Sequence, residues 1–124
     1  MSIDNFPLIM IRCLLLTIAI ETIVGLILGI RNKKDIFNIV LVNIVTNPIV
    51  VSIPILIYMY FGYKYEIISL YVLEVITVLV EGLIYYKVLK YKKINSFLLS
   101  LLLNLSSYLI GELINILWRE IVND

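Results

Sequence analysis

Four long apolar runs constrain the fold of this sequence more than any other feature. They cover residues about 7–30, 36–61, 65–86 and 95–118, and each is long enough to cross a bilayer, which takes about 20 residues. Because 62% of the 124 residues are hydrophobic, a soluble domain of this size could not bury them all. A segment in lipid must satisfy its own backbone hydrogen bonds, so each run predicts a helix. We therefore expect an all-α membrane protein in which residues 1–124 form a single integral membrane domain.

The first run differs from a secretory signal peptide. It is longer than a typical apolar signal region, lacks a small-residue cleavage pattern, and contains Arg12 and Glu21. We expect it to be retained as the first of four transmembrane helices.

Basic residues predict the orientation. The turns at 31–34 and 87–93 together hold seven of the Lys and Arg residues, whereas the opposite side holds only Arg12, Lys64 and Arg119. The positive-inside rule then predicts a multi-pass protein of the cell membrane with both basic hairpins in the cytoplasm and both termini outside. Aromatic residues gather near the two expected interfaces, where such rings anchor helices. They are Tyr58, Tyr60, Phe61, Tyr63, Tyr65 and Trp118 on the outer side, and Tyr85, Tyr86 and Tyr91 on the inner side.

The two predicted hairpins resemble each other. In each, a Glu is followed eight residues later by a Gly, then by a basic turn and an Asn-x-x-Thr/Ser motif. Because both hairpins run in the same direction, the pattern indicates a parallel internal repeat of helices 1–2 and 3–4. The matching positions are Glu21 and Glu74, Gly29 and Gly82, Asn43 and Asn104, and Thr46 and Ser107.

Each predicted helix carries its polar residues on one face, at about 100° per residue. Polar groups are costly in lipid, so we expect these faces to point toward one another inside the bundle. The faces are Thr17, Glu21 and Gly25; Asn43, Thr46, Asn47 and Pro54; Glu74, Thr77, Glu81 and Tyr85; and Ser96, Ser100, Asn104, Ser107, Gly111 and Asn115.

Three carboxyl groups lie deep in the predicted membrane. Counting about 1.5 Å per residue from the basic turns, Glu21 and Glu74 fall near the middle and Glu81 closer to the cytoplasm. An acidic residue at the centre costs roughly 2.5–3.5 kcal/mol, and no Lys, Arg or His lies at this depth. Either some of these groups are protonated at neutral pH or a cation lies between them; alternatively, protonated carboxyls and amides merely join the helices by hydrogen bonds. The candidate proton, ion or substrate-binding residues are Glu21, Glu74, Glu81, Asn43, Thr46, Asn47, Asn104 and Ser107.

Several small residues and one proline are expected to serve helix packing. Gly25-x-x-x-Gly29 follows the small-xxx-small pattern, which lets helix backbones approach closely. A proline one turn after Ile44 leaves the carbonyl of that residue without its usual donor, and Thr46 or Asn47 could satisfy it. The expected packing positions are Gly25, Gly29, Pro48 and Gly111.

The composition disfavours many chemistries. Without histidine, the chain lacks the usual ligand of catalytic zinc and haem and the base of a Ser-His-Asp triad. It also lacks a Gly-rich phosphate loop, and a net charge of +1 gives no basis for nucleic-acid binding. The single Cys13 can form no internal disulfide. We expect no metal, no other cofactor and no enzymatic activity.

Two functions agree with these features. The leading hypothesis is a small transporter or channel-like protein whose buried Glu and Asn residues bind a proton, a cation or a small polar or cationic solute. The alternative is an accessory or receptor-like subunit that docks on a larger membrane complex through its polar helix faces. A membrane enzyme acting on lipid-linked substrates is weaker, because no nucleophile–base pair is evident. Besides membrane lipids, we expect a homodimer or a partner membrane protein, since four helices enclose little volume.

Overall fold

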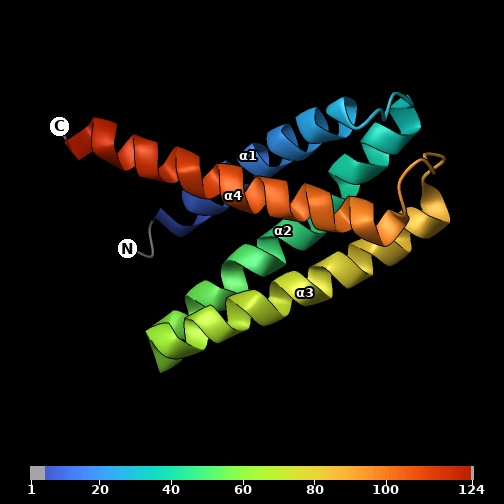
Figure 1. The fold of residues 1–124 in the computed structure, drawn as a ribbon. Helices are drawn as coiled ribbons and strands as arrows, with labels where there is room; N and C mark the ends of the chain where they lie inside the picture. Colours follow the sequence, from blue (N-terminus) through green and yellow to red (C-terminus); the bar gives the residue numbers. More distant parts are fainter. Residues whose placement is uncertain (1–4, 124) are drawn as a thin grey trace.

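The computed structural model describes residues 5–123, which form a bundle of four helices (Figure 1). Helix α1 covers Phe6–Ile27, α2 covers Lys33–Phe61, α3 covers Tyr63–Val88 and α4 covers Ser96–Asn123. Each of them contains a segment long and apolar enough to cross a membrane. The predicted all-α fold with four membrane-spanning helices is thus confirmed, with helix ends that differ from the predicted ones by up to five residues.

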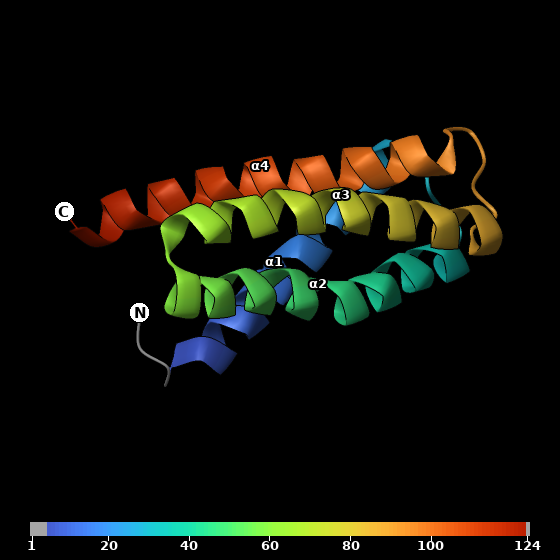
Figure 2. The same ribbon diagram turned by 90° about the horizontal axis from the view of Figure 1, so that it is seen from below.

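The helices form a closed ring. Each one packs on the next in the chain, and α4 packs back on α1. The α1–α2 and α3–α4 turns lie at one end of the bundle, while both termini and the α2–α3 turn lie at the other (Figures 1 and 2). We call these the basic end and the terminal end. The two hairpins therefore point the same way, as predicted; which end faces the cytoplasm stays a prediction.

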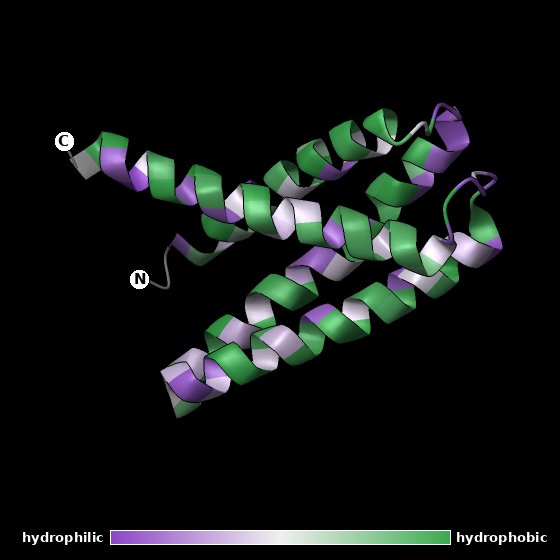
Figure 3. Cartoon of the chain, in the orientation of Figure 1, coloured by the Kyte–Doolittle hydropathy of each residue, from purple (hydrophilic) through white to green (hydrophobic). Residues whose placement is uncertain are grey.

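Most residues of the helices are hydrophobic, and the most hydrophilic segments are the two turns of the basic end (Figure 3). Large apolar side chains such as Leu15, Val75 and Leu109 are more than half exposed. In a bilayer this apolar surface faces lipid, so the exposed hydrophobic residues do not conflict with the fold.

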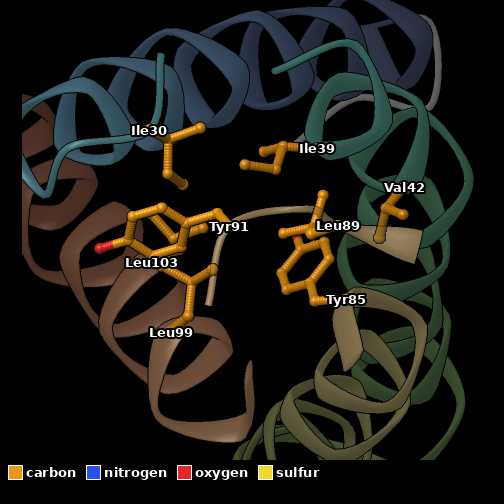
Figure 4. Close-up of a cluster of buried hydrophobic side chains, with 8 residues drawn as sticks. All are labelled: Ile30, Ile39, Val42, Tyr85, Leu89, Tyr91, Leu99 and Leu103. Carbon is orange, nitrogen blue, oxygen red and sulfur yellow. The ribbon is translucent and has the colours of Figure 1, made fainter. Parts of the chain in front are cut away.

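The apolar core lies at the basic end. Its side chains come from α2, α3 and α4 and from both basic turns (Figure 4). Asn32 and Asn95 begin the helices that follow these turns, because their side-chain oxygens accept hydrogen bonds from the backbone N–H groups of Lys34 at 2.8 Å and Phe97 at 2.9 Å. The core residues are Ile30, Ile39, Val42, Tyr85, Leu89, Tyr91, Leu99 and Leu103.

Asp35 fastens the two basic turns to each other. Its carboxylate is 2% exposed and accepts hydrogen bonds from the backbone N–H groups of Lys90 at 3.0 Å and Tyr91 at 2.9 Å. The Tyr91 hydroxyl donates in return to the carbonyl of Leu28 at 2.7 Å. Since these bonds join segments more than fifty residues apart, the basic end is closed by side chain-to-backbone contacts as well as by its apolar core.

The terminal end is more open. From the basic end toward the termini, α4 diverges from α3 (Figure 1). Gly62 alone connects α2 to α3, with a φ of +95° that few other residues adopt readily. The aromatic side chains near this turn are well exposed, from 53% for Tyr58 to 79% for Tyr60, in agreement with an interfacial position.

The aromatic prediction fails at the basic end. Tyr85 is completely buried and Tyr91 is 9% exposed, whereas Tyr86 is 65% exposed. Tyr85 and Tyr91 therefore belong to the interior, because their rings pack in the core and the Tyr91 hydroxyl has a backbone partner there.

The expected glycine contact in the first helix is also wrong. Helix α1 ends at Ile27, and Gly29 lies in the following turn with a φ of +103°. Gly25 is buried, and a Cβ atom there would lie 3.5 Å from Ile30, at an ordinary contact distance. The closest approach involving a glycine lies elsewhere: a Cβ atom on Gly82 would come within 2.5 Å of the Phe97 ring, so α3 and the start of α4 pack tightly there.

Helix α2 continues through both of its prolines. Pro48 and Pro54 lie inside the span Lys33–Phe61. The expected repair of the Ile44 carbonyl by Thr46 or Asn47 is not observed. Both side chains bond elsewhere, because each contributes to the polar interior described next.

Candidate functional site

Glu21 lies on α1 and is fully buried. The Asn43 side-chain amide on α2 donates a hydrogen bond to its Oε1 atom at 3.3 Å. The same amide also donates to the carbonyl of Ile39, one turn earlier, at 3.0 Å, and this second bond fixes its direction. The Oε2 atom of Glu21 is buried without a hydrogen-bond partner.

Glu81 lies on α3 and is also fully buried. The Asn104 amide on α4 donates to its Oε2 atom at 2.8 Å and to the carbonyl of Ser100, one turn earlier, at 2.8 Å. The Oε1 atom lies 2.8 Å from the Thr46 hydroxyl on α2. Glu81 is therefore held from two helices, one in each hairpin.

These contacts correct the register of the internal repeat. In each hairpin a buried Glu of the first helix accepts from an Asn of the second, and that Asn also bonds the carbonyl four residues earlier. The counterpart of Glu21 is thus Glu81, not Glu74 as the sequence suggested. The motif Asn43-x-x-Thr46 and Asn104-x-x-Ser107 keeps its predicted equivalence.

The remaining candidate amide and hydroxyl groups lie around this pair. Asn47 donates to the Thr17 hydroxyl at 3.2 Å, and its Oδ1 atom is buried without a partner. The Ser107 hydroxyl donates to the carbonyl of Asn104 at 3.0 Å. Both residues are half-buried and belong to the wall of a cavity.

That cavity has a volume of about 290 Å³ and is lined by residues of all four helices. It extends from Asn43 and Glu81 in the interior to Ile9 and Asn115 near the terminal end. Four glutamates and no Lys or Arg belong to its lining, so its charge favours cations. The four are Glu66, Glu74, Glu81 and Glu112.

Glu74 is placed apart from the buried pair. It is half-buried, and it belongs both to the cavity and to an apolar groove of about 350 Å³ between α3 and α4. This groove is formed mainly by Leu and Val side chains that face the lipid side of the bundle. Glu74 therefore connects the acidic interior with the membrane-facing surface.

The arrangement does not resemble a metal centre. Among residues 5–123, no group of three or more His, Cys, Asp or Glu side chains is arranged to hold a metal ion. A pair of carboxyl groups surrounded by amides and hydroxyls can bind a proton, or it can bind a monovalent cation or an amine through oxygen atoms.

The sequence reasoning missed one residue beside the site, Tyr85, and one structural contact at the basic end, that of Asp35. Tyr85 lies next to Glu81 and Glu21, and its place four residues after Glu81 on the predicted polar face was the available signal. Asp35 carried no signal, because its partners are backbone N–H groups of a distant turn.

No protein-family profile matches this chain, and no curated protein or solved structure matches it either. The features that bear on its function are the buried glutamates, their amide and hydroxyl partners, and the cavity beside them.

Proposed function

We propose that this protein is a small membrane transporter or channel-like protein whose Glu21–Glu81 pair binds a proton, a cation or a small polar or cationic solute. One observation carries the proposal: two carboxyl groups are fully buried between amides and hydroxyls, beside a cavity that Glu66, Glu74 and Glu112 make more acidic. Bundle stability alone does not require this arrangement. An unpartnered buried polar atom costs about 1–3 kcal/mol, and Glu21 retains one.

The cavity supports a cargo that is small and not anionic. Its volume of about 290 Å³ lies near the lower limit of the range for small-molecule sites, about 300–1,000 Å³. An anion would meet four glutamates and no cationic side chain in the lining. Entry from the terminal end is favoured because the basic end is closed by the Asp35 and Tyr91 contacts.

The test is ion flux in proteoliposomes. The purified protein is reconstituted with a pH-sensitive dye inside, and flux is driven by an imposed membrane potential. We expect Glu21→Gln and Glu81→Gln each to reduce flux at least tenfold, because the amide cannot bind or release a proton. Glu120→Gln is the matched control, since Glu120 is exposed on α4 and does not belong to the cavity lining. Wild-type flux in both Glu21 and Glu81 variants would contradict the proposal.

One observation favours the second candidate, an accessory subunit. The groove between α3 and α4 brings Glu74 close to the lipid-facing surface, where a Lys or Arg on a partner helix could reach it. Purification from native membranes tests this role. Docking would be favoured over transport by two results together: a stoichiometric partner copurifies with the wild-type protein but not with Glu74→Gln, and the wild-type protein shows no flux.

A further inference from the structure

The buried pair has an incomplete two-fold pattern of hydrogen bonds. Each carboxyl takes an amide from its own hairpin, Asn43 for Glu21 and Asn104 for Glu81. Each also has a hydroxyl of the other hairpin nearby, at equivalent positions of the repeat: Thr46 beside Glu81 and Ser107 beside Glu21.

Only one of the two hydroxyl contacts is formed. The Thr46 oxygen lies 2.8 Å from Glu81 Oε1. The Ser107 hydroxyl instead donates to the carbonyl of Asn104, and the facing carboxyl keeps Oε2 unpartnered. The repeat thus provides two equivalent arrangements, and the structure contains one of them.

The contacts of the Thr46 hydroxyl indicate that the two carboxyls differ in protonation. The Thr46 hydroxyl has one proton but lies within hydrogen-bond distance of two acceptors, Glu81 Oε1 at 2.8 Å and the Val42 carbonyl at 2.9 Å. If Glu81 is ionised, one of these two short O···O contacts contains no proton, although the Val42 carbonyl still accepts a helical N–H. If Oε1 of Glu81 is protonated, Glu81 donates to Thr46 and Thr46 donates to Val42. All three groups are then satisfied.

Glu21 fits the ionised form. Its Oε1 atom already accepts from Asn43, and Oε2 has no acceptor to which a proton could be donated. The Tyr85 hydroxyl is buried and lies near both carboxyls, and Glu81 acts on it more strongly than Glu21 does. Two ionised carboxyls buried near each other would repel each other strongly, so a pair of this kind favours holding one proton.

We infer that Glu21 and Glu81 share a single proton, which Thr46 holds on Glu81 in this structure and Ser107 would hold on Glu21 in a second, equivalent state. In passing between the states, the O–H bond on Glu81 breaks, one forms on Glu21, and the negative charge moves the opposite way. The inference deepens the proposed function, because it makes the proton pair the element that alternates during transport. The other titratable groups acting on the pair are Glu74 and Tyr85 of α3, while α2 and α4 contribute amides and hydroxyls.

Infrared spectroscopy of the purified protein tests the number of protons. The carbonyl band of protonated carboxyl groups is measured in a Glu74→Gln background, and the spectrum of the variant that also carries Glu21→Gln and Glu81→Gln is subtracted. We expect the area of one protonated carboxyl per chain at neutral pH and a doubled area on acidification. An area of zero or two carboxyls at neutral pH would overturn the inference.

Hydroxyl variants test the position of the proton. Thr46→Val should shift this band, because Glu81 loses its acceptor, whereas Thr46→Ser should leave it nearly unchanged. Ser107→Ala should also leave it unchanged. A band that responds to Ser107→Ala but not to Thr46→Val would overturn the placement on Glu81. The flux assay separates the two proposals. If the Glu variants lose flux but the infrared band shows two protonated carboxyls, only the shared proton is refuted. If the band shows one protonated carboxyl but the wild-type protein conducts no protons, transport is refuted.

Discussion

Removing the Asp35 carboxylate should destabilise the bundle by opening its basic end. The carboxylate accepts two backbone hydrogen bonds, from Lys90 at 3.0 Å and Tyr91 at 2.9 Å, and it is almost fully buried. A hydrogen bond to a charged group contributes about 1.5–3 kcal/mol. Asp35→Ala, which loses both bonds, should therefore lower the free energy of unfolding by about 3–6 kcal/mol, and Asp35→Asn, which keeps one acceptor oxygen, by about half of that.

Glu66 provides the matched control. Like Asp35, it is an acidic residue in the first turn of a helix, but its carboxylate makes no bond to another segment among residues 5–123. Glu66→Gln should lose only the interaction with the helix dipole, about 0.3–1 kcal/mol. Unfolding of the purified protein by SDS in mixed micelles, followed by circular dichroism, measures these differences. If Asp35→Ala is no less stable than Glu66→Gln, the contact between the two basic turns does not hold the bundle closed.

Three further predictions concern packing and access. Gly82→Ala should lower the free energy of unfolding by about 1–3 kcal/mol in the same assay, because the new Cβ would lie 2.5 Å from the Phe97 ring. Gly111→Ala should be tolerated, since the nearest neighbour of its Cβ would be 4.0 Å away. Equal stability of the two variants would contradict the tight packing at Gly82. Tyr91→Phe removes one hydrogen bond between the basic turns and should lower the free energy of unfolding by about 0.5–1.5 kcal/mol. An unchanged unfolding curve would contradict this prediction. Cys13, the single cysteine, belongs to the cavity lining, so a membrane-impermeant thiol reagent should label it from the terminal side of oriented vesicles and not from the basic side; the reverse pattern would place the opening at the wrong end.

The sequence predicted the helices well because lipid leaves the backbone few alternatives. The largest differences lie at helix ends that depend on local contacts. Helix α1 ends at Ile27 because the chain turns at Gly29 with a positive φ, and α2 begins at Lys33 because Asn32 caps it. Helix α4 continues to Asn123, beyond the aromatic residue Trp118 that was expected to end it.

The polar interior was predicted in part. Helical periodicity brought Glu21, Asn43, Glu81 and Asn104 to the inside, and the structure joins them as two pairs. Periodicity could not distinguish Glu74 from Glu81 as the counterpart of Glu21, because the two residues lie seven positions apart on one helix face. The bonds from Asn104 decide it.

Other contacts were harder to find from residue patterns. Tyr85 was expected both at the membrane interface and on the inward polar face of its helix, and only the second expectation is confirmed: the ring fills the core and the hydroxyl lies beside the buried pair. Asp35 binds backbone groups 55 and 56 residues later in the chain, and any residue except proline presents such groups.

The central claim is that Glu21 and Glu81 act as one site, and proton flux through proteoliposomes containing the single and double Gln variants tests it most directly. Residues that act as a unit show strongly non-additive losses. Each single variant should therefore lose flux almost completely, and the Glu21→Gln, Glu81→Gln double variant should be no worse than either. Partial losses in the single variants that multiply in the double variant would show two independent groups and would contradict the claim.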